Sequence, residues 1–158
     1  MRVLNKIEGE IAEAAKQVIQ QANVDVRRQD ENAARRQFKL AVEAAQQAND
    51  LESLRAFLAY QARERDKVWG RSVGGQLLVQ VAWTALRRKI QAFETQAGSE
   101  VPHVWNEITN NGPRRNEVHL AMASRFFAHI ERAFEIWKDQ QARIFYFGPP
   151  PQQEQSTP

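Results

Sequence analysis

Three histidines, at positions 103, 119 and 129, are the side chains best suited to metal or acid–base chemistry. His103 and Glu107 have the four-residue spacing that places two ligands on one face of a helix, but two ligands do not make a metal site. No His-Glu-x-x-His motif is present, and the chain has no cysteine to supply a thiolate ligand or nucleophile. We therefore expect no metal site and no bound cofactor.

A phosphate-binding loop is suggested by Gly70 and Gly75, which have the glycine spacing of Gly-x-x-x-x-Gly-Lys-[Ser/Thr]. Gln76 and Leu77 stand where that motif needs lysine and serine or threonine. The backbone N–H groups of Gly74-Gly75 could meet one phosphate at a helix start, although a turn between two antiparallel helices is the favoured interpretation. Ser72 lies in Gly70-Arg71-Ser72-Val73-Gly74, which has the Gly-x-Ser-x-Gly spacing, but the sequence predicts no strand to support a nucleophile there. We expect no enzymatic activity.

The positive charge is concentrated in one part of the chain. The 158 residues carry 22 basic and 19 acidic side chains, a net charge of only +3. Residues 55–89, however, hold eight basic and two acidic side chains, a net charge of +6. Sixteen of the basic residues are arginine, which binds phosphate through paired, planar hydrogen bonds. This segment suits a sugar–phosphate backbone, and the candidate nucleic-acid-binding residues are Arg63, Arg65, Lys67, Arg71, Arg87, Arg88 and Lys89.

Two tryptophans are candidates for contact with a partner. Trp83 lies off the apolar stripe of its expected helix, which marks either a partner surface or a second buried face. Stacking of Trp83 on a nucleobase is the less favoured interpretation. Trp105 lies in a short helical segment that follows Pro102. We expect Trp83 and Trp105 to contribute to a protein interface.

Helices are the regular elements that the sequence predicts, because apolar residues recur at three- and four-residue steps and do not alternate as in a strand. The expected helices cover about 2–23, 28–48, 51–69, 75–97, 100–109 and 117–137. Asn49 and Asn116 are expected to cap two of them, and Gly98 to end one. Whether the first two helices are separate stays open, because only Asn23-Val24-Asp25 could break them.

The fold class is therefore all-α, with one bundle of five or six helices over residues 1–148. The Pro- and Gln-rich tail, residues 149–158, is expected to be disordered. No apolar run approaches the roughly 18 residues of a membrane span, and the first residues lack the apolar core of a signal peptide. With no cysteine and no such segments, we expect a cytoplasmic protein.

Two segments resemble a known family. Leu58-Ala59-Tyr60-Gln61-Ala62-Arg63 resembles a Leu-Ala-Tyr motif followed by arginine, and residues 125–134 resemble an Arg-Phe-x-x-Phe-Phe-Glu-type helix. Both motifs belong to the all-helical small subunit of type III CRISPR effector complexes, in particular type III-A, with type III-B as a second assignment. Gln37-Phe38-Lys39 is a weaker match upstream. The resemblance covers roughly residues 33–140.

The resemblance implies a non-catalytic subunit that stacks along a filament of backbone subunits and contacts the guide RNA–target RNA duplex in antiviral defence. It implies RNA, other complex subunits and further copies of this chain as partners. Arg63, Arg65 and Lys67 are the first candidate contacts, and the resemblance places Tyr60 and three phenylalanines, Phe126, Phe127 and Phe134, in the core. The alternative is a helical protein-interaction adaptor without nucleic acid; a DNA-binding regulator is disfavoured because no helix-turn-helix is evident.

Overall fold

The all-α class is confirmed by the computed structural model, which describes residues 2–23 and 31–150. Residues 24 and 25 of the possible break and residues 151–158 of the expected tail lie outside the described residues. The described part contains seven α-helices, one or two more than expected: α1 (Arg2–Ala22), α2 (Glu31–Gln47), α3 (Leu51–Ala62), α4 (Leu78–Glu100), α5 (Pro102–Thr109), α6 (Gly112–Lys138) and α7 (Gln140–Phe147). The unexpected helix is α7, which follows Asp139, whose carboxylate accepts the Gln141 N–H.

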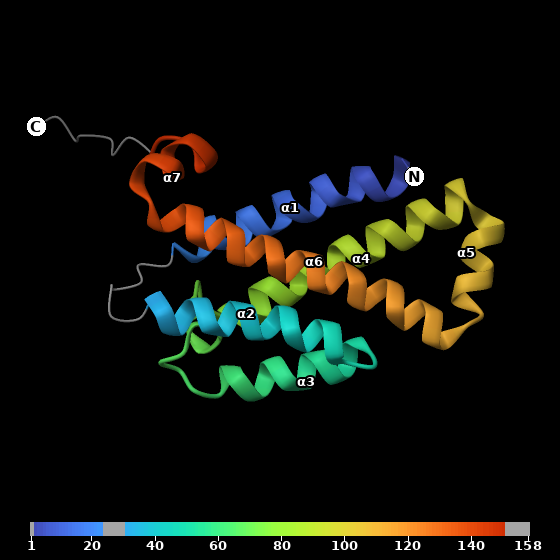
Figure 1. The fold of residues 1–158 in the computed structure, drawn as a ribbon, viewed down its shortest axis with the longest axis horizontal. Helices are drawn as coiled ribbons and strands as arrows, with labels where there is room; N and C mark the ends of the chain where they lie inside the picture. The colour runs from blue at the N-terminus through green and yellow to red at the C-terminus, as the bar shows by residue number, and fades with distance from the viewer. Residues whose placement is uncertain (1, 24–30, 151–158) are drawn as a thin grey trace, which may run out of the picture.

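The long helix α6 lies at the centre of the bundle, with α1 and α2 packed along it and α4 packed against α1 (Figure 1). Phe126, Phe127 and Phe134 on α6 are fully buried, so their expected core positions are confirmed. Phe38 of α2 stands edge-on to Trp69, with ring centroids 5.2 Å apart. Tyr60 was expected in the core, but 59% of its surface is exposed, because Leu58 and Ala62 form the buried face of α3 instead.

Two ion-paired clusters fasten the outer helices to α6. Glu8 of α1 accepts hydrogen bonds from Arg125 Nη1 at 2.7 Å and faces His129 Nε2 at 2.9 Å. The bond to His129 is the main cause that holds the pKa of Glu8 below its ordinary value, and Arg125 adds to it. Glu135 pairs with Arg35 of α2; burial raises the Glu135 pKa, but the bonds from Arg35 and Lys138 outweigh burial and lower it.

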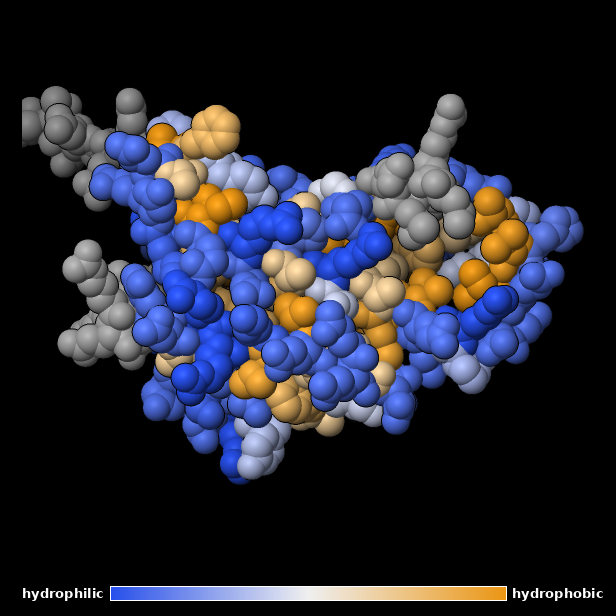
Figure 2. All heavy atoms as spheres, viewed as in Figure 1, coloured by the Kyte–Doolittle hydropathy of each residue, from blue (hydrophilic) through white to orange (hydrophobic). Residues whose placement is uncertain are grey.

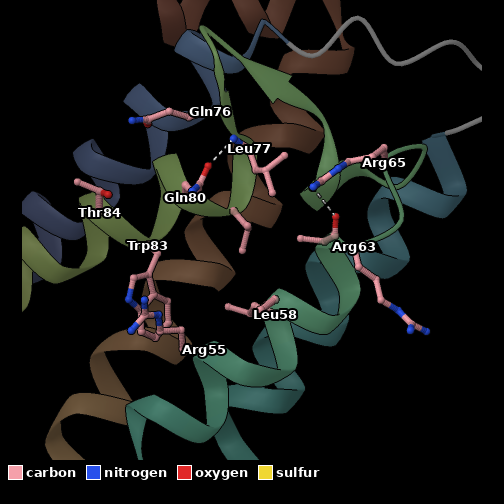
Figure 3. Close-up of a pocket in the computed structure, with 12 residues that line it drawn as sticks. Arg55, Leu58, Arg63, Arg65, Gln76, Leu77, Gln80, Trp83 and Thr84 are labelled. Carbon is pink, nitrogen blue, oxygen red and sulfur yellow. Dashed lines mark hydrogen bonds between the residues drawn. The ribbon is translucent and has the colours of Figure 1, made fainter.

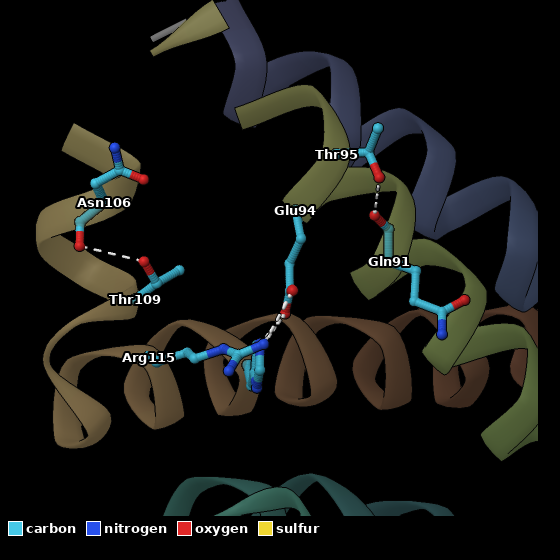
Figure 4. A network of polar contacts seen from close by, with 7 residues as sticks. Gln91, Glu94, Thr95, Asn106, Thr109 and Arg115 are labelled. Carbon is cyan, nitrogen blue, oxygen red and sulfur yellow. Dashed lines mark hydrogen bonds and ion pairs between the residues drawn. The ribbon is translucent and has the colours of Figure 1, made fainter. Parts of the chain in front are cut away.

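A third cluster joins α4 to α6. Glu94 of α4 accepts from Arg115 Nη2 at 3.1 Å (Figure 4) and also pairs with the buried ring of His119. In each of the three clusters, a carboxylate on one helix pairs with a cation on another helix. Three acidic residues of the flanking segments, Glu8, Glu94 and Glu135, are thereby paired within the bundle.

Several expected helix boundaries were wrong. Asp50, not Asn49, caps α3, and the Ser53 N–H donated to its carboxylate lowers the Asp50 pKa. Asn111, not Asn116, caps α6, because its amide oxygen accepts the Arg114 N–H and Pro is favourable in a first turn. Helix α4 continues through Gly98 to Glu100, and it stops there because the residue before Pro102 is biased away from helix.

Candidate nucleic-acid interface

The connection between α3 and α4 positions the arginines. Helix α3 ends at Ala62, so Arg63 and Lys67 do not share a helical face as expected. The chain instead returns to the bundle through a 3-10 turn, η1 (Val68–Gly70), all of whose residues are buried. Gly70 is required there, because a Cβ would lie 2.4 Å from the carbonyl oxygens of Ala62 and Glu64. This close contact fixes residues 63–70 as a bent strap.

A short hairpin follows, formed by β1 (Ser72–Val73) and β2 (Gln76–Leu77). Its turn uses Gly74 and Gly75 at φ values of 55° and 85°, which glycine adopts without strain. The two glycines form a turn as predicted, but the turn joins two short strands and not two helices. Because α4 begins only at Leu78, however, Gly74-Gly75 does not stand at a helix N-terminus, and the phosphate-meeting alternative was wrong in its placement.

A hollow of about 540 Å³, which we name the cationic hollow, lies between α3 and the first turns of α4 (Figure 3). Three arginines, Arg55, Arg63 and Arg65, line it. No Asp or Glu is among the described residues that line it. The remaining lining residues are Leu58, Ala59, Ala62, Leu77 and Val79 as the apolar part, and Gln76, Gln80, Trp83 and Thr84.

Each of these arginines has a local contact that orients it. The guanidinium of Arg63 lies 3.9 Å from the centroid of the Tyr60 ring. Arg65 Nη1 donates to the Ala62 carbonyl at 3.1 Å, at the end of α3 (Figure 3). Arg55 Nη1 lies 3.6 Å from Glu52 Oε2, an exposed and weakly coupled pair. Within the described residues, no carboxylate pairs with Arg63 or Arg65.

A second hollow, of about 420 Å³, lies between α1 and α4, and we name it the α1–α4 hollow. Arg88 and Lys89 line it, together with Gln17 and Gln21 of α1. Again no acidic side chain is among the described lining residues. The two hollows share Gln76 and Thr84, so they are neighbours on one surface. Arg87 is exposed on α4, one turn beyond Trp83.

The structure thus divides the seven predicted cations. It brings Arg63 and Arg65 into one hollow and Arg88 and Lys89 into the next, with Arg87 exposed on the same helix. The other two, Lys67 and Arg71, line neither hollow. Lys67 Nζ lies 2.9 Å from Glu64 Oε2, and Arg71 is half-buried beside the hairpin.

The two tryptophans have different surroundings. Trp83 is half-buried in the wall of the cationic hollow, so it lies neither on a fully buried second face nor on a freely exposed surface. Trp105 is only 8% exposed and packs edge-on against Phe93, with centroids 5.4 Å apart. Its expected exposure to a partner was wrong, because α5 folds back onto the end of α4 and covers the ring.

Several lining residues were missed by the sequence reasoning. Arg55 was counted in the basic segment but not assigned to the site, although it lies two turns before Arg63 on α3. Gln76, Gln80 and Thr84 carry no motif, and the signal that could have found them is their proximity to the glycine-rich turn. Gln17 of α1 is distant in sequence and is brought in only by packing.

Outside this surface, the described residues contain no group of three or more side chains suited to holding a metal ion. Among the same residues, no helix combines the length and apolar character needed to cross a bilayer. Comparison of the chain with models of protein families, with curated proteins and with solved structures finds no match.

Proposed function

We propose that this chain is a non-catalytic, RNA-binding small subunit of a type III CRISPR ribonucleoprotein complex. The observation that carries the RNA-binding part is the surface formed by the cationic hollow and the α1–α4 hollow. Five cations line the two hollows, and no carboxylate does so among the described residues. A positively charged surface next to low-dielectric walls attracts a polyanion.

Arginine is the dominant cation of this surface, which suits phosphate more than a diffuse anionic partner. A guanidinium donates two parallel hydrogen bonds to one phosphate, whereas an ammonium acts as a point charge. Arg55, Arg63 and Arg65 come from α3 and the strap, and Arg88 from α4. Cations spaced over two helices can follow successive phosphates of one strand without reading its sequence.

The assignment to a type III complex rests on the sequence resemblance and on the helical fold that it implies. Under this proposal, copies of the chain stack beside one another and beside the backbone subunits in the cytoplasm, and the cationic surface faces the guide and target RNA. The chain then contributes binding and positioning, while other subunits carry the chemistry.

A helical protein-interaction adaptor is the second candidate, and one observation favours it. Phe145 on α7 is 92% exposed and the neighbouring Ile144 is 43% exposed. Hydrophobic side chains are visible at this end of the molecule (Figure 2). A single exposed apolar pair is small for a protein interface, so this candidate stands second.

Affinity purification of the tagged chain from its own cells tests the assignment. The proposal expects RNA and the large and backbone subunits of a type III complex to be recovered together with the chain. Ribonuclease treatment before elution should release part of this material. Recovery of partner proteins without RNA and without these subunits would contradict the proposal and favour the adaptor.

A further inference from the structure

The cationic hollow is lined by apolar residues as well as by arginines. Leu58 and Ala62 are 1% and 2% exposed, so they form a closed floor between α3 and α4. Leu77 and Val79 continue this apolar wall from the start of α4. A phosphate group alone gains nothing from an apolar floor, since its oxygens need polar partners. The hollow therefore suits a ligand with an anionic and an apolar part.

We propose that the cationic hollow accepts the base of one unpaired RNA nucleotide, while its arginines bind the adjoining phosphates. This inference rests on the proposed RNA-binding function and specifies how that site takes its ligand. The volume of about 540 Å³ lies within the range of roughly 300–1,000 Å³ typical of small-ligand sites, so one base with its sugar is a suitable occupant. Because the charged residues that line the hollow are all arginines, an anionic nucleic acid complements its charge.

Trp83 supplies the aromatic surface against which a base can pack. Its ring is half-buried in the wall, and it lies at the same end of the hollow as Arg55 (Figure 3). Within the described residues its Nε1–H donates to no acceptor, whereas the buried Trp69 Nε1 donates to the Gln37 carbonyl at 3.2 Å. Base–aromatic stacking tolerates any base, because every base has a π-face.

Two amide side chains add polar groups beside this apolar wall. Gln80 Oε1 accepts the Leu77 N–H at 2.8 Å, which orients the amide and leaves its NH₂ group as a donor (Figure 3). Gln76 and Thr84 stand at the border with the α1–α4 hollow. A base carbonyl can therefore meet a donor while the ring stays on the apolar wall.

The geometry selects unpaired nucleotides. A base inside a duplex is stacked and paired, so it cannot enter the hollow without being extruded, which breaks its stacking and pairing. Phosphate contacts alone do not make this distinction. The inference therefore predicts tighter binding to single-stranded or bulged RNA than to a continuous duplex at equal phosphate number.

Fluorescence anisotropy with three labelled RNAs of equal phosphate number tests the inference: a single strand of uridylates, the same strand carrying abasic residues, and a continuous duplex of half the length. The wild-type chain should bind the intact strand roughly 5- to 100-fold more tightly than the abasic strand. Trp83→Leu should reduce this ratio to about one, and Trp83→Phe should keep most of it because it retains a ring. Intrinsic tryptophan fluorescence should be quenched by the intact strand and much less by the abasic strand.

The outcomes separate the inference from the proposed function. If intact and abasic strands bind equally, and both weaken when Arg55, Arg63 and Arg65 are changed to Gln, the base pocket is wrong while the phosphate surface stands. If the wild-type chain binds none of the three RNAs, the proposed function itself is contradicted. The comparison of intact and abasic strands needs no variant, so a failure of Trp83→Leu to fold leaves the test decisive.

Discussion

The guanidinium of Arg63 lies 3.9 Å from the centroid of the Tyr60 ring, so an exposed aromatic side chain holds an arginine at the cationic hollow. Tyr60 points outward from the last turn of α3, and Arg63 is the residue that directly follows the helix end at Ala62. Each residue alone would be an ordinary surface side chain. As a pair they restrict the rotamers of Arg63, so less side-chain entropy is lost when a phosphate binds.

Replacing Tyr60 by leucine should weaken RNA binding without unfolding the chain. An exposed cation–π contact contributes about 0.5–1 kcal/mol, which corresponds to a loss of affinity of about two- to fivefold. Tyr60→Phe retains the ring and serves as the matched control, with affinity close to wild type. Anisotropy titration measures the affinity, and thermal unfolding should give similar Tm values for both variants. Equal RNA affinity of Tyr60→Leu and Tyr60→Phe would show that the pair does not serve binding.

Gly70→Ala should destabilise the bundle, whereas Gly9→Ala should not. An added Cβ at Gly70 meets two backbone carbonyl oxygens at 2.4 Å, and overpacking of this kind costs about 1–3 kcal/mol. Gly9 lies within α1 with nothing within 4 Å of its Cβ position, so alanine there should stabilise by about 0.5–1 kcal/mol. Urea unfolding monitored by circular dichroism measures both values. A Gly70→Ala chain as stable as wild type would contradict the tight strap.

The long helices could be predicted from the sequence because the apolar residues that they bury recur at helical spacing along the chain. The apolar stripe expected over 28–48 corresponds to α2 at 31–47, and the three phenylalanines of α6 follow the same rule. The strap could not be predicted, because its shape depends on contacts distant in sequence. Trp69 is held by the carbonyl of Gln37 and by Phe38, 31 or more residues away, and no local pattern records this.

The site was predicted in its charge but not in its geometry. The charge count located the segment that carries the arginines, since a local excess of cations is visible without a structure. The division into two hollows depends on α1, which packs against α4 and adds Gln17 to the wall beside Arg88. The exposure of Tyr60 was also missed, because the apolar face of α3 uses only one side of this short helix.

Reversing the charges of Arg87, Arg88 and Lys89 to glutamate should reduce RNA affinity by about tenfold or more at low salt, because three phosphate contacts are lost and replaced by repulsion. Far-ultraviolet circular dichroism should remain unchanged, since Arg87 and Arg88 are exposed. The matched control reverses three exposed cations outside both hollows, namely Arg36, Lys39 and Arg132. Equal losses in the two triple variants would mean that only net charge matters, and the surface assignment would fail.

Glu8→Gln should destabilise the chain at neutral pH and have little effect in acid. The folded-state pKa of Glu8 lies below its ordinary value because of His129 and Arg125, so its contribution is complete above that ordinary value. The contribution is then lost as the pH falls through the lowered pKa, between about pH 5 and pH 2. Its carboxylate is 40% exposed, so solvent screening limits the neutral-pH loss to about 0.5–1 kcal/mol.

Unfolding free energies of wild type and Glu8→Gln, measured from pH 7 to pH 2, test this expectation. Glu13→Gln is the matched control, because Glu13 is exposed on the same helix and has no ion pair within the described residues. Its stability should follow that of wild type at every pH. A constant difference between Glu8→Gln and wild type across the range would mean that the charge of Glu8 is not the cause.

The salt dependence of RNA binding tests most directly the claim that the cationic surface binds phosphate. With six cations engaged (Arg55, Arg63, Arg65, Arg87, Arg88 and Lys89), the log–log slope of affinity against salt on single-stranded RNA should be about −4. Changing the three arginines of the cationic hollow to Gln should bring the slope to about −2, because each lost phosphate contact removes about 0.7. A slope near zero for the wild-type chain, or a slope that these three substitutions leave unchanged, would contradict the account.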